Sequence, residues 1–246
     1  MIEKFFLYKH SGETPLSCMD RFRLCFPEYV AVSMTYAGRL DPLASGLLYI
    51  LAGESCKQKD DFLCKDKEYR VDILLGMETD THDPLGIVGR TTPGGLISLQ
   101  EIKKVLKSFQ KTFEQQYPAY SSKTIKGKHL HMHAREGTIA EEDLPVHTVT
   151  IYTIQTVDIF VMPLEEIVQK AKDKIKTVSG DFRQEESIES WNALLQKYNS
   201  DSLYPTVTIF VRASSGTYMR QLAYDIGKSL GIPALAWNIV RTKIVL

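Results

Sequence analysis

A single carboxylate stands between two glycines in the segment Gly38–Gly46, which reads GRLDPLASG. Pro42 fixes its own φ, and its ring disfavours the helical region for the preceding Asp41. The two glycines can adopt positive φ or let another backbone approach closely. We therefore expect Asp41 on a stiff loop ahead of a buried strand, which suits holding one carboxylate in place for chemistry. Taken alone, the segment favours an ordinary Asp-Pro turn, so the remaining chain has to decide.

Further stretches gather polar and aromatic side chains into compact motifs. They are Lys67–Tyr69 (KEY), Gly76–Gly86 (GMETDTHDPLG), Gln116–Lys123 (QYPAYSSK), Ala134–Gly137 (AREG) and Ser214–Gly227 (SSGTYMRQLAYDIG). The acids Asp80 and Asp83 suggest a cation-binding loop, but their spacing does not fit an EF-hand. Turn hydrogen bonds to their own backbone are the competing interpretation of these two acids.

Hydrophobic periodicity predicts the elements that must position these motifs. We expect strands at residues 2–8, 47–52, 68–75, 146–161, 206–213 and 234–246. We expect helices at residues 15–26 and 217–230, a helix opened by a capping box of Ser98 and Glu101, and two helices within 164–199 broken near Ser179-Gly180. A long loop is expected over 76–95. Strands and helices mix without a βαβ rhythm, which favours an α+β fold with a mixed, largely antiparallel sheet flanked by helices.

Composition places the chain among ordinary globular proteins. Its 246 residues are 43% hydrophobic and 24% charged, enough for one large domain or two small ones. Lys+Arg and Asp+Glu both number 30, and this neutral total argues neither for nor against a nucleic-acid partner. The four cysteines form no CxxC pair, and no signal-peptide or membrane-spanning pattern is present. We therefore expect a cytoplasmic protein that does not enter a membrane.

A local basic stretch is the one signal for a nucleic acid. Residues 115–135 hold four Lys or Arg, three His and no Asp or Glu, with Tyr117 and Tyr120 among them. Cations interleaved with aromatic rings suit phosphates and unstacked bases, although a solvated flexible loop is the competing interpretation. The histidines at 129, 131 and 133 would share one side of a strand, which makes a zinc site conceivable. No cysteine or acid nearby completes such a site, so we favour RNA contact or surface exposure and expect no metal.

In this order and spacing the motifs resemble those of the TruB-type tRNA pseudouridine-55 synthases. That family shows G-x-L-D-P-x-A-x-G-L-L, K-x-Y, T-D-T-x-D-x-x-G, P-x-Y-S-x-x-K, A-R-x-G and G-T-Y-I-R-x-L-x-x-D in series. The resemblance runs from about Leu7 to Thr242. It implies the pseudouridine synthase fold, a single catalytic domain over 1–246 and an RNA-gripping insertion at about 86–140. Many members continue into a small C-terminal RNA-binding domain, which we expect this chain to lack.

The resemblance also implies roles for individual residues. Asp41 matches the essential aspartate, Arg220 the arginine that pairs with it, and Tyr69 the tyrosine that packs against the target uracil and is thought to act as a base late in the reaction. Asp83 matches a further active-site acid, and Tyr36 stands where the family has a histidine that contacts the flipped nucleotide. Other substrate contacts are implied at Tyr120, Lys123, Lys128, Arg135 and Tyr218. Plain strand packing for Tyr69 and a surface salt bridge for Arg220 are the competing interpretations.

The implied reaction has clear physical requirements. Uracil is detached from C1′ of its ribose, turned and rejoined through C5, so no redox change occurs and no cofactor is expected. A carboxylate must remain ionised beside the sugar, and an arginine favours that charged form and orients it through two hydrogen bonds. The base must leave its stack, and an aromatic face can hold it there. Attack on C1′, addition to the uracil and removal of the C2′ proton all remain open as the chemical path.

The expected function is conversion of a uridine in the tRNA T loop to pseudouridine, with the tRNA T arm as partner and no obligatory protein partner. Tyr36 and Arg39 depart from the TruB pattern, and Gly-Arg-Leu-Asp also occurs in RluA-type pseudouridine synthases. A synthase for ribosomal or other RNA is therefore the nearest alternative. An RNA-binding or RNA-folding protein without catalysis is the second, and a metal-dependent nuclease the third. The helical stretch 164–199 exceeds the usual connection and is either an extra RNA or partner surface or a decorated edge.

Overall fold

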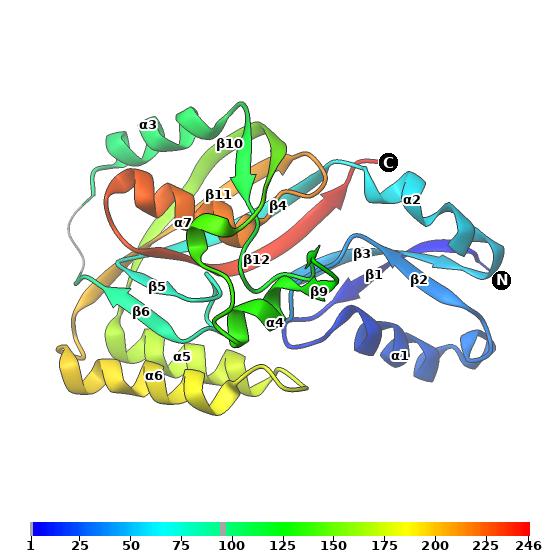
Figure 1. Cartoon of the computed structure of the whole chain (residues 1–246), viewed down its shortest axis with the longest axis horizontal. Coiled ribbons are helices and arrows are strands. Elements are labelled where there is room, and N and C mark those ends of the chain that lie inside the picture. The colour runs from blue at the N-terminus through cyan, green and yellow to red at the C-terminus, as the bar shows by residue number, and fades with distance from the viewer. Residues whose placement is uncertain (1, 94–96) are drawn as a thin grey trace.

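A mixed sheet of eight strands runs through the computed structural model, which describes residues 2–93 and 97–246 (Figure 1). Along the sheet the order is β1 (Lys4–Lys9), β3 (Ser45–Ala52), β12 (Ala234–Ile244), β4 (Lys67–Leu75), β11 (Leu203–Ala213), β10 (Val146–Pro163) and β7 (Thr112–Gln116), and β2 (Met34–Ala37) pairs with β3. Every pairing is antiparallel except that of β3 with β12. The α+β class with a mixed, largely antiparallel sheet is confirmed.

Helices cover the sheet from both sides. They are α1 (Pro15–Cys25), α2 (Lys59–Leu63), α3 (Leu99–Phe109), α4 (Leu130–Arg135), α5 (Leu164–Lys176), α6 (Gln184–Lys197) and α7 (Met219–Leu230). In Figure 1, α3 and α7 lie above the long strands, and the antiparallel pair α5 and α6 lies below them. Two short hairpins complete the described chain, β5 (Met77–Thr79) with β6 (Val88–Thr91) and β8 (Thr124–Ile125) with β9 (Lys128–His129).

Two of the hydrophobic cores follow from the alternation of side chains along the strands. Ile73 of β4 belongs to the core under α3 and α7, and its neighbour Leu74 belongs to the core under α5 and α6. The second core includes the fully buried Trp191 of α6 and the buried Trp237 of β12. The stretch 164–199 is therefore built into the domain, and its predicted pair of helices is confirmed as α5 and α6.

Local end signals act as the sequence predicts. The Ser98 hydroxyl accepts from the backbone N–H of Glu101, and the Glu101 carboxylate accepts from the N–H of Ser98, which confirms the capping box of α3. Helix α7 ends at Gly231, whose φ of 75° lies in the left-handed region that favours glycine. These contacts fix where α3 and α7 begin and end, and α7 carries Arg220.

Two local expectations differ from the structure. The predicted loop over 76–95 contains the β5–β6 hairpin, and residues 94 and 95 lie outside the described part of the chain. The three histidines do not share a strand, because the chain leaves the β8–β9 hairpin at His129 and enters α4 at Leu130. Burial of Leu130 and a hydrogen bond from its backbone N–H to the Lys123 carbonyl set this turn into a helix.

Gly46 allows the backbone of β12 to approach β3 closely. It has φ of 113°, and a Cβ placed there would lie 2.6 Å from the backbone nitrogen of Arg241 on β12. We expect Gly46→Ala to lower the free energy of unfolding by about 3 kcal/mol, because neither backbone can move without breaking the β3–β12 pairing.

Gly127→Ala is the matched control, since Gly127 also has positive φ but a Cβ there would meet nothing within 4 Å. That variant should lose only about 1 kcal/mol, the cost of the left-handed backbone alone. Urea unfolding of both variants measures the difference. Equal losses would show that the close approach of Arg241 contributes nothing.

Candidate active site

A buried lysine donates hydrogen bonds to one side of the Asp41 loop. The Lys9 ammonium donates to the carbonyls of His10, Pro42 and Ala44, with 3.0 Å to the first two. Lys9 has no exposed surface, and burial lowers the pKa of its ammonium to about 8. The lysine therefore ties the Asp41 loop, through the carbonyls of Pro42 and Ala44, to the end of β1.

A buried arginine donates hydrogen bonds to the other side of the same loop. The Arg241 guanidinium, on β12, donates to the carbonyls of Leu47 at 2.7 Å, Gly38 at 3.1 Å and Arg39 at 3.3 Å. Arg241 is 1% exposed. Carbonyls before and after Asp41 are thus tied to two buried cations. The sequence analysis missed Arg241, because a charged residue near the chain end carries no local sign of burial.

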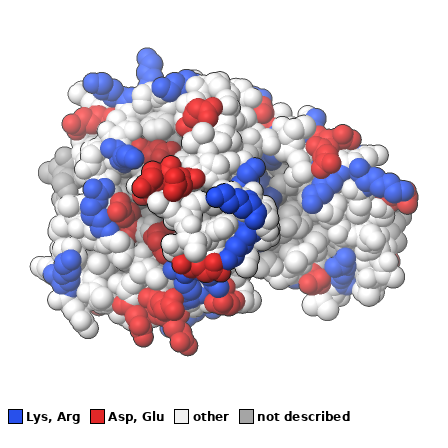
Figure 2. All heavy atoms as spheres, viewed as in Figure 1, with Lys and Arg blue, Asp and Glu red and all other residues white. Residues whose placement is uncertain are grey.

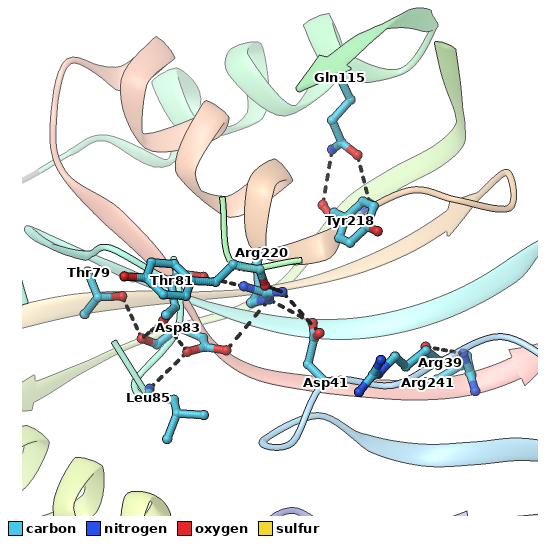
Figure 3. A network of polar contacts seen from close by, with 11 residues as sticks. Arg39, Asp41, Thr79, Thr81, Asp83, Leu85, Gln115, Tyr218, Arg220 and Arg241 are labelled. Atoms are coloured by element: carbon cyan, nitrogen blue, oxygen red, sulfur yellow. Dashed lines mark hydrogen bonds and ion pairs between the residues drawn. The ribbon is translucent and has the colours of Figure 1, made fainter. Parts of the chain in front are cut away.

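Asp41 itself forms a two-point ion pair with Arg220. The Arg220 Nε donates to Asp41 Oδ2 at 2.8 Å, and its Nη2 donates to Asp41 Oδ1 at 3.1 Å (Figure 3). The predicted pairing of these two residues is confirmed, and the surface salt-bridge interpretation is wrong, because Arg220 is only 3% exposed. The Asp41 side chain keeps 30% of its surface exposed, so a substrate can reach it.

Arg220 also joins two other segments. Its guanidinium donates to the Thr81 carbonyl at 2.7 Å and to the Tyr120 carbonyl at 3.2 Å, and it lies 3.8 Å from the Asp83 carboxylate. Burial lowers the pKa of Arg220, but the carboxylates of Asp41 and Asp83 outweigh it and leave that pKa raised. The guanidinium is therefore the charged centre at which these segments meet.

Asp83 lies behind this pair. Its carboxylate accepts from the Thr81 hydroxyl at 2.6 Å and from the Leu85 backbone N–H at 3.0 Å, and the residue is 5% exposed. Burial raises the pKa of Asp83, although Arg220 opposes the shift. These hydrogen bonds are also the turn contacts that the sequence left as an alternative. Asp83 is thus both a turn residue and a neighbour of the Arg220 guanidinium.

Tyr69 forms part of the wall beside Asp41. It lies on β4, is 8% exposed and packs in the core under α3 and α7. Burial raises the pKa of its hydroxyl, and the nearby Arg241 opposes that shift only in part. Tyr69 therefore packs within the sheet and also lines the pocket.

These residues line a cavity of about 550 Å³, a size typical of small-ligand sites. Of the residues to which the sequence analysis assigned substrate contacts, Asp83, Tyr120, Arg135 and Tyr218 line it together with Asp41, Tyr69 and Arg220. Gln115 holds Tyr218 in place, since its amide accepts from the Tyr218 N–H at 2.8 Å and donates to the Tyr218 carbonyl at 3.1 Å (Figure 3). Gln115 is fully buried and was not predicted.

Three predicted substrate contacts do not line this cavity. Tyr36 lies on β2, with the Lys59 ammonium 5.6 Å from its ring centre. Lys123 lies 5.1 Å from the ring centre of Tyr117, and Lys128 pairs with Glu136. Their roles stay predictions, and only a substrate that extends beyond the cavity would reach them.

Residues outside the predicted set of catalytic and substrate-binding residues also line the cavity. Arg39 and His131 do so from segments already noted, and Asp181, Phe182 and Arg183 come from the loop between α5 and α6. That loop is separated from Asp41 by more than half the chain. No spacing rule could have brought it to the site.

A metal centre finds no support in the described chain. Among residues 2–93 and 97–246 no group of three His, Cys, Asp or Glu side chains is placed to hold an ion. His129 and His131 stack on each other with ring centres 5.4 Å apart.

Within residues 2–93 and 97–246, no helix has the length and apolar character that crossing a bilayer requires.

Comparison with known proteins bears directly on this site. The sequence model described as TruB family pseudouridylate synthase (N terminal domain) matches residues 29–174, more than half of the chain. The chain belongs to the TruB family. The match contains the Asp41, Tyr69 and Asp83 segments and ends before the α5–α6 loop and Arg220.

Curated relatives carry the name tRNA pseudouridine synthase B. The chain is 30% identical to that of Clostridium tetani over 85% of its own length and 56% of the relative's. It is 32% identical to that of Bacillus pumilus over 96% and 63% of the two lengths, and 28% identical to that of Bacteroides thetaiotaomicron over 98% and 85%. The chain thus spans little more than half of the first relatives it matches.

A solved structure shares the fold. The chain is similar to one in the crystal structure of a Cbf5-Nop10-Gar1 complex, with a TM-score of 0.59 at 17% identity. The similarity covers 98% of this chain and 48% of that one. The pseudouridine synthase fold expected from the sequence is therefore confirmed.

Arg220 should contribute strongly to stability through its geometry. We expect Arg220→Lys to lower the free energy of unfolding by about 2 kcal/mol, because an ammonium cannot serve the Asp41 carboxylate and two buried carbonyls at once.

Arg70→Lys is the control, since Arg70 is half exposed and lies 3.8 Å from Asp72. It should change the free energy of unfolding by less than about 0.5 kcal/mol. Denaturant titration of both variants makes the comparison. An Arg220→Lys protein as stable as the control would contradict the central place given to this guanidinium.

Proposed function

We propose that this protein isomerises a uridine in the tRNA T loop, at position 55, to pseudouridine. The observation that carries the proposal is the two-point Asp41–Arg220 pair in the wall of a cavity shared with Tyr69. Membership of the TruB family and the names of the curated relatives support a tRNA substrate. We infer catalytic roles for Asp41, Tyr69 and Arg220 on this basis.

The contacts around Asp41 match what the proposed reaction requires of a carboxylate. The reaction breaks the bond from uracil N1 to C1′, forms one from C5 to C1′, and exchanges the hydrogen on C5 for one on N1. Arg220 donates two hydrogen bonds to the carboxylate, which fix its direction. Asp41 can then attack C1′ or remove a proton beside it, while Lys9 and Arg241 keep its loop from moving.

Tyr69 serves in this proposal as a packing surface for the displaced uracil. Its ring lies in the cavity wall, and a base that has left its stack gains stabilisation from an aromatic face. The position of Tyr69 in the cavity wall supports this packing role. Tyr218, held by Gln115 at the start of α7, forms another part of the wall.

The RNA would approach over the basic stretch at 115–135. Within the expected insertion at 86–140, β7 joins the main sheet and α3 packs against the main body. We therefore assign the RNA contacts to residues 117–140, which leave the sheet after β7 and return to it at β10. Figure 2 shows Lys and Arg side chains over this region, around α4 and the β8–β9 hairpin. The T arm of tRNA is the proposed partner.

Asp41→Asn tests the chemistry directly. Tritium release from unmodified tRNA labelled at C5 of uridine should fall by about 10³-fold or more, because the amide can neither attack nor accept a proton. Affinity for tRNA should change by only a few fold, since the substitution is nearly isosteric. EDTA should not affect the parent protein, and mapping of the product settles the position. Normal turnover by the variant would remove Asp41 from the reaction.

The RNA interface has a separate test. Replacing Lys123, Lys126 and Lys128 by Gln should weaken tRNA binding and flatten the dependence of its affinity on salt, because fewer counterions are released. Replacing Lys103, Lys104 and Lys107 of α3 by Gln removes the same charge from an exposed helix face outside residues 117–140 and serves as control. Binding constants over a series of KCl concentrations measure both. An unchanged slope for the first variant would place the RNA elsewhere.

A further inference from the structure

The loop between α5 and α6 brings side chains from the helical pair into the catalytic cavity. Asp181, Phe182 and Arg183 line the cavity together with Asp41 and Arg220. The family match ends at residue 174, so these residues lie outside it. The proposed reaction gives them no role so far.

Helix α6 is anchored on the segment that carries Asp83. The Trp191 indole donates to the Pro84 carbonyl at 3.0 Å, and the Ser187 hydroxyl donates to the Leu85 carbonyl at 2.7 Å. The Ser190 hydroxyl accepts from the backbone N–H of Val88 at 3.1 Å. The helical pair α5 and α6 is therefore held against the active site, and the loop between them has a defined position relative to Arg220.

The loop itself is ordered by contacts within it and across the cavity. The Gln184 amide donates to the carbonyls of Val178 and Gly180. Arg135, from the basic stretch, donates to the Asp181 carboxylate and to the Asp181 carbonyl, each at 2.8 Å. The helical pair and the proposed RNA-binding segment thus meet at the cavity rim.

Arg183 occupies a strained and specific position in this loop. Its φ of 60° lies in the left-handed region, which is uncommon for a residue with a side chain and occurs often at functional sites. The centre of its guanidinium lies 4.4 Å from the ring centre of Tyr120, and one of its nitrogens lies 2.8 Å from the Asp80 carboxylate. The Tyr120 carbonyl accepts a hydrogen bond from Arg220. Tyr120 therefore contacts both Arg183 and the Arg220 of the Asp41–Arg220 pair.

We propose that Arg183 is a substrate-positioning residue that contacts a backbone phosphate of the RNA beside the flipped uridine. This inference rests on the proposed function and deepens it. A guanidinium stacked on an aromatic ring keeps its edge for hydrogen bonds, and Asp80 takes one nitrogen of a group with five N–H donors. The remaining edge suits a phosphate at the cavity rim.

The charges around the hairpin favour this placement. Glu185, Glu186 and Glu189 lie on α6, and Figure 2 shows acidic side chains gathered over this helix. Such a surface repels RNA, so the RNA backbone must pass on the cavity side of the loop, where Arg183 lies over the Tyr120 ring and lines the cavity together with Arg135. The helical pair α5 and α6 would thus limit the path of the RNA on one side, and Arg183 would contribute one positive charge to that path.

Arg183→Gln, Arg183→Lys and Asp80→Asn separate a phosphate contact from a structural clamp. Asp80→Asn breaks the ion pair of Arg183 but keeps its charge. For Arg183→Gln we expect the KM for tRNA to rise about tenfold with kcat within about twofold, and the slope of log affinity against log salt to fall by about 0.7–0.9, the value for one phosphate contact. Arg183→Lys and Asp80→Asn should both keep the parent slope.

The contrary results are equally specific. An Arg183→Gln protein with the parent slope, or one that loses affinity only as much as Asp80→Asn does, would make Arg183 a structural clamp and overturn the inference. Thermal unfolding of each variant shows that the comparison is made on folded protein. Tritium release by the parent separates the two proposals: no release overturns the proposed function, and release with an unaffected Arg183→Gln protein overturns this inference alone.

Discussion

The site depends on one buried guanidinium. Removing Arg220 from water is costly, and the structure offsets that cost with two carboxylates and two carbonyls from segments far apart in the sequence. Each of these segments must be in place for the charge to be satisfied. The same contacts that orient Asp41 therefore also tie the first third of the chain to α7, so that the fold and the direction of the reactive carboxylate are set together.

Two more buried cations extend this arrangement to the backbone. Lys9 and Arg241 donate to carbonyls on both sides of Asp41, and Gly46 lets β12 approach closely enough to place Arg241 there. A hydrophobic pair in their place could be as stable, but it would leave the loop carbonyls without hydrogen bonds. These cations thus fix one conformation of the loop that carries Asp41.

The cavity has a centre and a rim built from different elements. Asp41, Tyr69 and Arg220 come from the loop before β3, from β4 and from α7, within a fold that this chain shares with the Cbf5 structure at 17% identity. The rim is built by the stretch 117–140 and by the α5–α6 loop, which meet through Arg135 and Asp181. In the function proposed above, chemistry and RNA recognition would therefore use different elements of the fold.

The sequence by itself determined most of the longer strands and helices. Capping at Ser98 and the glycine after α7 are local signals, and both predicted what the structure contains. The pairing of Asp41 with Arg220 was implied by the resemblance of their motifs to a known family, and the structure contains that pair. Only the tertiary structure decided that Lys9 and Arg241 are buried, that Tyr36 lies away from the cavity and that Arg183 lies in it. The reason is physical: a charge is expected at the surface unless other segments of the chain satisfy it, and partners from other segments leave no mark on local periodicity.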